Sequence, residues 1–114
     1  MNFDFSDEAI KDCKKLSKKF FSLSSDLEEL KKLLSIQPLG VGKHFVILKN
    51  TEQLQIVKGR LFCRSLKKSS LRVIFSADSS HENILFLEIY FKGNKEREDE
   101  QRIKNYLKRT EDLS

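Results

Sequence analysis

Long apolar runs are absent from this 114-residue sequence, as is any clustering of cysteines and histidines that would suit a metal. No segment approaches the ~20 apolar residues that a membrane-spanning helix needs, and no basic stretch followed by an apolar one opens the chain. Cys13 and Cys63 are far apart, and His44 and His81 stand alone in polar segments. We therefore expect no membrane span, no secretory signal, no metal site and no Cys–His nucleophile pair. Two reduced thiols in a cytoplasmic protein are predicted instead.

The composition is that of one globular domain spanning residues 1–114. Hydrophobic residues make up 39% of the chain and charged residues 34%, and no repeat, linker or low-complexity segment interrupts it. The net charge is +5. A basic protein of this size favours an anionic partner, and the charge alone leaves open whether that partner is nucleic acid or an acidic protein.

Two helices are predicted in the first third of the chain. Ser6 is a candidate N-cap, followed by Asp7 and Glu8 in the first turn. Ser25 and Glu28 have the spacing of a capping box, which predicts the start of a second helix. Pro38 and the glycines after it end that helix. Apolar residues at helical spacing are Ala9, Ile10, Cys13, Leu16 and Phe20 in the first helix, and Leu27, Leu30, Leu33 and Leu34 in the second.

The rest of the chain predicts strands and then a last helix. Short β-prone segments at 45–48, 54–66, 71–76 and 84–92 are separated by polar turns, a pattern typical of an antiparallel meander. Ile103, Tyr106 and Leu107 have helical spacing and predict a short C-terminal helix. The expected order is ααββββα, an α+β domain in which the helices pack on one face of the sheet.

Residues 53–77 contain six basic residues and no acidic one. In a chain with nearly balanced charges, such a window predicts a sheet face that binds phosphates, because arginine forms paired hydrogen bonds with them. The alternative is a solvated face that only keeps the protein soluble. The basic residues of this window are Lys58, Arg60, Arg64, Lys67, Lys68 and Arg72.

The register of the segment at 54–66 leaves two arrangements open. A regular strand places Lys58, Arg60, Phe62 and Arg64 on one face, whereas a bulge at Gly59 reverses the faces before it.

Charged residues also interrupt the last strand. Alternation places Glu88, Tyr90 and Lys92 on one face of it, and Arg72 on the preceding strand is the expected partner of Glu88 if the register permits. Glu88 is either one half of a structural ion pair or a group for proton transfer beside the arginines. The structural pair is the favoured interpretation.

Three segments together resemble the RelE/ParE superfamily of type II toxin–antitoxin systems. They are FSDEAIKDCKKLSKKF with DLEELKKLL, then CRSLKKSSLRVIF, then FLEIYFKGNKERED before a short helix. The resemblance implies a helical hairpin packed on a small twisted antiparallel sheet. For the RelE-like branch it further implies ribosome-dependent cleavage of mRNA by 2′-hydroxyl attack, with no metal or other cofactor, and a cognate antitoxin that blocks the toxin.

The same resemblance implies roles for individual residues of this sequence. It implies that Arg72 is a catalytic phosphate stabiliser and that Lys95 donates a proton to the leaving 5′-oxygen. The family often carries a pair of basic residues on the preceding strand, one of them a candidate general base. Without gaps, these positions fall on Cys63 and Ser65 of this sequence. Arg64 or Lys67 beside them is the expected substitute, and Arg64 is the catalytic candidate. The C-terminal tyrosine or histidine of some members has no counterpart, since Gln101 falls near it and Tyr106 fits the core of the helix. Candidate RNA-binding residues are Lys58, Arg60, Lys67, Lys68 and Lys92.

Three functions remain open at this stage. The first is an RNA-cleaving toxin that acts on the ribosome and mRNA. The second is a ParE-like inhibitor of DNA gyrase without nuclease chemistry. The third is a degenerate relative that only binds an antitoxin. The basic sheet face favours the first function, whereas the missing basic pair and the missing C-terminal aromatic weigh against it.

Overall fold

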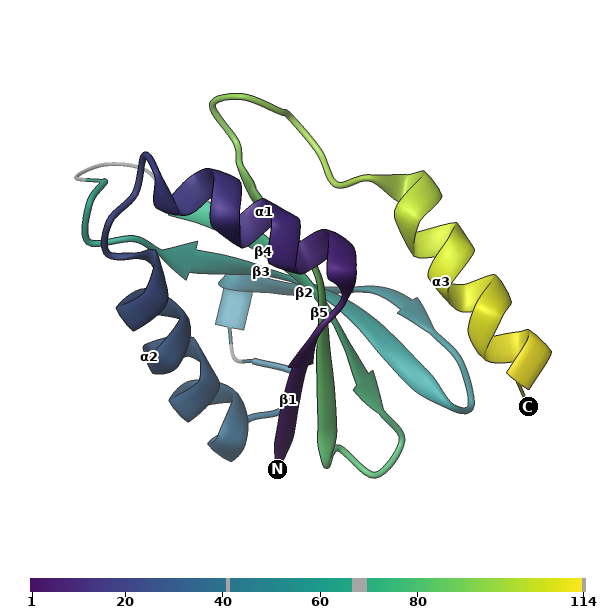
Figure 1. Ribbon diagram of the computed structural model, residues 1–114. Coiled ribbons are helices and arrows are strands. Elements are labelled where there is room, and N and C mark those ends of the chain that lie inside the picture. Colours follow the sequence, from purple (N-terminus) through teal and green to yellow (C-terminus); the bar gives the residue numbers. More distant parts are fainter. Residues whose placement is uncertain (41, 67–69, 114) are drawn as a thin grey trace.

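The computed structural model describes residues 1–40, 42–66 and 70–113. It confirms the α+β class, with a hairpin of helices, a sheet and a C-terminal helix (Figure 1). No helix in these described ranges is long and apolar enough to cross a bilayer. The elements in order are β1 Asn2–Phe5, α1 Asp7–Ser17, α2 Leu23–Ile36, a 3-10 helix Gly42–His44, β2 Phe45–Asn50, β3 Leu54–Phe62, β4 Ser70–Asp78, β5 Asn83–Phe91 and α3 Glu100–Leu113.

The sheet contains the predicted meander and one further strand. Its order is β1-β5-β4-β3-β2, and β2 to β5 pair antiparallel as the turns indicated. The addition is β1, which pairs parallel to β5 from Asn2 opposite Asn83 to Phe5 opposite Phe86. Strand β1 was not predicted from the sequence, because four residues are too short to establish a period. The sheet is therefore mixed, with the N-terminal strand at one edge.

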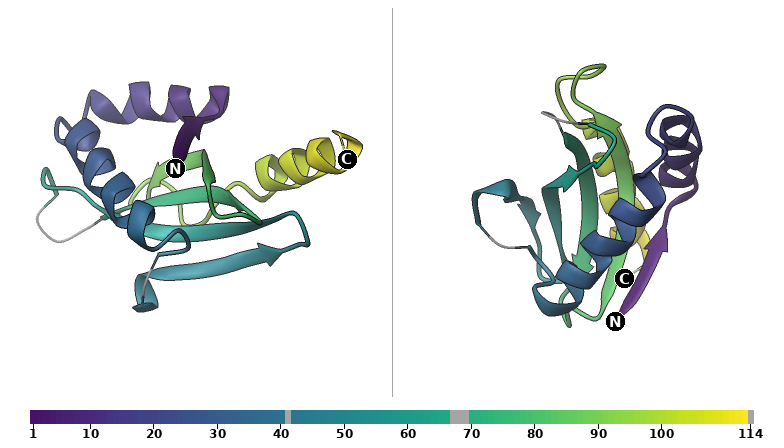
Figure 2. Two further views of the ribbon diagram at one scale, coloured as in Figure 1. Left: turned by 90° about the horizontal axis from the view of Figure 1, so that it is seen from below. Right: turned by 90° about the vertical axis from the view of Figure 1, so that its left-hand side faces the viewer.

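Helices cover both faces of the sheet, so the expectation that all of them share one face is wrong for α3. In β4, Val73 and Phe75 belong to the core under α1 and α2, whereas Ile74 between them packs with Ile103 of α3. Because successive side chains of a strand point to opposite faces, α3 covers the face away from the hairpin. Figure 1 shows α1 and α2 grouped together and α3 apart from them, and Figure 2 shows the twist of the sheet beneath the hairpin. The apolar residues on both faces of β5 account for this cover on each side.

No bulge occurs at Gly59. The pairing of β3 with β4 runs without a shift from Leu54 opposite Asp78 to Phe62 opposite Ser70. A Cβ atom on Gly59 would lie 2.6 Å from the ring of Phe45, so the glycine is required by the close approach of that ring. Of the two arrangements considered for this segment, the regular strand is confirmed, but it ends at Phe62 and does not reach residue 66.

The first helix begins as predicted and the second does not. The hydroxyl of Ser6 accepts a hydrogen bond from the backbone N–H of Ala9 at 3.1 Å, which caps α1. The N-cap of α2 is Ser22, three residues before Ser25, and the Ser22 hydroxyl makes no capping bond to the backbone. It donates instead to Asp26 Oδ2 at 2.7 Å. The capping-box expectation failed because the helix begins earlier, at a point fixed by hydrogen bonds between Ser22 and Ser65 of the turn after β3.

Candidate functional site

Three of the predicted cations lie on one face of the sheet. Arg60 of β3 is directly opposite Arg72 of β4, and Lys58 is one step further along β3 on the same face. Their neighbours Val57, Leu61 and Val73 point into the core under the hairpin, so the cations point to the other face. Arg72 and Arg60 thus lie side by side on the sheet face that is turned away from the helical hairpin.

These cations line an open hollow of about 280 Å³, which we call the basic hollow. Its charged lining consists of Lys43, Lys58, Arg60 and Arg72, together with His44 from the turn before β2. Among the described residues, no carboxylate lines it. Partial burial lowers the pKa of Arg72, and the charge of Arg60 lowers it further, while Tyr90 acts in the opposite direction. Arg72 nevertheless stays protonated near neutral pH, so the hollow is a site of concentrated positive charge.

Tyr90 continues the row of Arg60 and Arg72 across the sheet. It lies opposite Arg72 on β5, and its hydroxyl is buried without a well-formed hydrogen bond to any described residue. Burial raises the pKa of Tyr90, while the nearby ammonium of Lys58 acts against this rise. Lys58 itself pairs with Glu98 at 2.9 Å; burial lowers the pKa of Lys58, but the contacts with Glu98 and Tyr90 outweigh it and the pKa is raised. Lys58 is therefore partly neutralised, whereas Arg60 forms no ion pair with the described residues.

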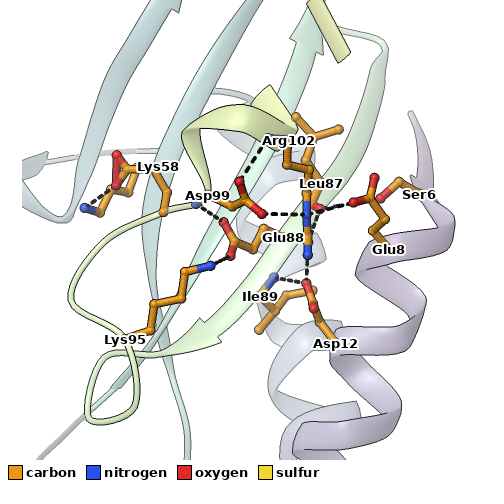
Figure 3. A network of polar contacts seen from close by, with 11 residues as sticks. Ser6, Glu8, Asp12, Lys58, Leu87, Glu88, Ile89, Lys95, Asp99 and Arg102 are labelled. Carbon is orange, nitrogen blue, oxygen red and sulfur yellow. Dashed lines mark hydrogen bonds and ion pairs between the residues drawn. The ribbon is translucent and has the colours of Figure 1, made fainter. Parts of the chain in front are cut away.

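Glu88 pairs with Lys95 and not with Arg72. The register places Ile74 opposite Glu88, so the condition set for a Glu88–Arg72 pair is not met. The Glu88 side chain is 3% exposed, and Oε2 accepts a hydrogen bond from Lys95 Nζ while Oε1 accepts one from the backbone N–H of Asp99 at 2.8 Å (Figure 3). Lys95 Nζ also lies 5.5 Å from the ring centroid of Tyr90. The carboxylate thus holds Lys95 over Tyr90, one strand away from Arg72.

A second set of contacts fixes the loop that carries Lys95. Arg102 of α3 donates to Asp12 Oδ2 at 2.7 Å and to the carbonyl oxygen of Leu87 at 2.9 Å (Figure 3). The same Asp12 oxygen accepts from the backbone N–H of Ile89 at 3.1 Å. Burial lowers the pKa of Arg102, but the hydrogen bond and charge of Asp12 outweigh it and the pKa is raised. Asp99 caps α3 by accepting from the backbone N–H of Arg102, so both ends of the loop are anchored.

Arg64 does not join Arg72 and Lys95. It lies in the turn after β3, where its Nε is 3.4 Å from Oδ1 of Asp26 on α2. The Asp26 side chain is 2% exposed and that of Arg64 is 67% exposed. Asp26 Oδ2 accepts further hydrogen bonds from the Ser22 hydroxyl and the backbone N–H of Arg64. The structure therefore places Arg64 on the hairpin side of the sheet, in contact with a buried carboxylate.

The remaining candidates are spread over the molecule. Lys92 is exposed in the turn directly after β5, and Lys67 and Lys68 lie outside the described residues. Cys63 and Ser65 contact Ser22, and Tyr106 bonds to Ser76 through its hydroxyl at 3.1 Å, as expected of a core residue of the helix. Both cysteines are free. Within the described ranges, no group of three or more potential metal ligands comes together.

One residue of this site, His44, was not predicted from the sequence to belong to it. His44 lines the basic hollow beside Arg60, and its ring lies 5.7 Å from that of Phe62 at an interplanar angle of 85°. In the sequence, His44 is separated from the basic window by a turn and a strand, and it stood out only as a lone polar residue. His44 lies next to Arg60 because β2 pairs with β3 and Phe45 stands opposite Gly59.

The hairpin, the mixed sheet and the basic hollow define a small α+β domain with a cationic sheet face. No protein-family model matches the sequence, and no curated protein matches it. The crystal structure of the archaeal RelE–RelB complex from Pyrococcus horikoshii OT3 contains a chain similar to this one. The TM-score is 0.60 at 20% sequence identity, over 81% of this chain and 94% of that chain. This chain therefore has a RelE-like fold, which confirms at the level of fold the resemblance carried by its sequence.

Proposed function

We propose that this protein is the toxin of a type II toxin–antitoxin system and that it cleaves mRNA on the ribosome. The observation that carries the proposal is the cross-strand pair of Arg60 and Arg72 in the basic hollow of a RelE-like fold. Two guanidinium groups on a preformed sheet can hold a phosphate and stabilise the negative charge that builds on it during cleavage. Because they sit on strands, little reorganisation is needed when the charge develops.

The proposed reaction is attack of a ribose 2′-hydroxyl on the adjacent phosphate. His44 accepts the hydroxyl proton, the 2′-oxygen bonds to phosphorus, and the bond from phosphorus to the 5′-oxygen breaks. Lys95 gives its proton to that leaving oxygen, so the products are a 2′,3′-cyclic phosphate and a 5′-hydroxyl. Arg60 and not Arg64 is the second arginine of the proposed site, since Arg60 lies in the hollow and Arg64 contacts Asp26. Protein side chains balance every charge in this scheme, so EDTA is expected to leave the rate unchanged once ribosome integrity is controlled.

The partner we propose is an acidic antitoxin that covers the same cationic face. The similar archaeal RelE chain is in a complex with RelB. The net charge of +5 and the absence of acidic residues from residues 53–77 favour an acidic partner here. The association rate of the purified pair is expected to fall as salt rises, because ions screen the attraction that steers the two proteins together. A small acidic reading frame next to this gene is the natural candidate, and an association rate indifferent to salt would contradict the proposal.

Primer extension on mRNA from induced cells tests the proposed function. Cleavage within translated codons, lost when translation is blocked, is the expected result. If growth stops without cleavage and gyrase activity falls, the ParE-like alternative replaces this proposal. If neither growth nor mRNA changes, the protein is a relative that only binds an antitoxin.

A further inference from the structure

Phe62 is a large apolar side chain that the fold leaves open at the edge of the basic face. It is the last residue of β3 and is 65% exposed. Alternation along the regular strand places it on the same face as Arg60, two residues away, which is about 6.8 Å along an antiparallel strand. Exposure alone says little, because Phe21, in the turn between α1 and α2, is 88% exposed. What distinguishes Phe62 is its place beside the arginines.

The contacts of Phe62 hold its ring in place without covering it. His44 meets the ring at 5.7 Å and nearly at a right angle, a favourable arrangement for two aromatic groups. A second hollow, of about 290 Å³, opens next to the ring and is also lined by His44 and Arg60. Arg60 and His44 therefore lie between this hollow and the basic hollow. A ligand could occupy both hollows at once.

We propose that Phe62 is a stacking platform for one nucleobase of single-stranded RNA whose phosphate is held by Arg60 and Arg72. This deepens the proposed function and rests on it for the substrate class. An aromatic ring next to arginine suits RNA, because in each nucleotide a planar base and a phosphate are joined through one sugar and so lie a short distance apart. The hollow next to Phe62 is lined by Asp26 and Glu29 together with apolar residues, so it suits the uncharged base, while the phosphate belongs in the basic hollow.

The absence of tryptophan from the chain allows a direct test of stacking. In Phe62→Trp the new indole is the sole tryptophan and reports on a base that stacks against it. Titration with a short single-stranded RNA is expected to quench this fluorescence to saturation. Inorganic polyphosphate, which offers the charge without bases, is expected to bind without that quenching. Phe21→Trp is the control, since Phe21 is also exposed but does not line the basic hollow, and its fluorescence should not respond to the RNA.

Affinity supplies the second measurement. Phe62→Ala is expected to weaken RNA binding about tenfold, the effect of losing one stacked base, while Phe62→Tyr retains it. The affinity of Phe62→Ala for polyphosphate should equal that of the unsubstituted protein. Thermal unfolding of each variant confirms that the fold is intact, which is expected because the side chain is mostly in solvent.

The outcomes separate this site from the proposed function. The stacking site alone is overturned by one combination of results: the unsubstituted protein cleaves mRNA, the fluorescence of Phe62→Trp is not quenched by RNA, and Phe62→Ala binds RNA with unaltered affinity. In that case Phe62 becomes a contact for a protein partner. Base-dependent quenching without any mRNA cleavage supports the nucleobase site and removes the nuclease function. RNA that binds neither variant nor the unsubstituted protein overturns the stacking site.

Discussion

Arg60 and Arg72 face each other directly across two antiparallel strands, with both side chains on the face away from the hairpin. Like charges in this position destabilise a sheet, because the side chains are near neighbours and repel each other. Partial burial of Arg72 adds to the cost and is reflected in its lowered pKa. A bound phosphate would relieve both effects, so the pair is better suited to holding an anion than to stabilising the free protein.

Arg72→Ala is expected to lower the rate of ribosome-dependent cleavage about a hundredfold, or by roughly 3 kcal/mol of transition-state stabilisation. The variant should keep its fold, because Arg72 belongs to neither hydrophobic core cluster. Single-turnover cleavage on programmed ribosomes and urea unfolding measure the two effects. Lys11→Ala, which removes an exposed cation on α1 and leaves the basic face intact, is the control and should change the rate little. Full activity of Arg72→Ala would remove the proposed mechanism.

His44→Gln is expected to slow the cleavage step by about a hundredfold, the usual effect of losing a general base, with RNA affinity retained. The control is His81→Gln, because His81 lies in the turn between β4 and β5 and contacts Gln55 at 3.3 Å. Binding measured by fluorescence anisotropy and cleavage measured at saturating protein separate the two quantities. An equal loss in both histidine variants, or none in His44→Gln, would show that another group accepts the proton.

Arg64→Ala tests whether this residue is structural. We expect a loss of about 1 kcal/mol in unfolding free energy, because the pair is largely exposed at the arginine and Asp26 keeps its other hydrogen bonds. Cleavage by the folded variant should equal that of the unsubstituted protein. Asp26→Ala should cost more, about 2 kcal/mol, since it leaves buried donors around Ser22 without their acceptor. A large loss of cleavage at unchanged stability would return Arg64 to the active site.

Glu88→Ala is expected to reduce stability by about 2 kcal/mol, because the buried backbone N–H of Asp99 loses its acceptor and Lys95 its anchor. Cleavage should fall less than in Arg72→Ala, since Lys95 itself remains. Urea unfolding and cleavage are again the measurements. The exposed Glu96, in the same loop, provides a control for the loss of one negative charge near Lys95. A larger effect of Glu88→Ala on chemistry than on stability would indicate that the carboxylate takes part in the reaction.

Stability should fall in acid through Asp78 in the turn between β4 and β5. Hydrogen bonds from the side chain and backbone of Asn83, and from Ser80 and the backbone of Glu82, outweigh burial and hold the pKa of Asp78 below its ordinary 3.8. Because the pKa of Asp78 is lower in the folded protein, the stabilisation is full well above the unfolded value of 3.8. It is lost as pH falls from there through the folded pKa. The difference in unfolding free energy between the protein and Asp78→Ala should therefore shrink between about pH 6 and about pH 3. A constant difference over this range would contradict the assignment.

Local patterns in the sequence predicted the elements, and pairing between distant segments decided the site. The Ser6 cap, the meander and the helix with Ile103 and Tyr106 follow from spacing alone. The partner of Glu88 could not be predicted, since it depends on the register of two strands and on the path of the loop after β5. The same holds for His44, which only the pairing of β2 with β3 brings beside Arg60. The face covered by α3 was missed because apolar residues on both faces of a strand do not say which helix covers which.

The pairing of β1 with β5 delays the completion of the fold during synthesis. Asn2 and its partner Asn83 are separated by 81 positions, so the first strand has no neighbour until most of the chain has left the ribosome. At about 5–20 residues per second, that interval is roughly 4 to 16 s. Helix α1 waits as well, since it packs on β5. A chain terminated before β5 would lack the strand on which both the N-terminal edge and Lys95 depend, so the proposed activity can arise only after β5 and the loop that follows it have been translated.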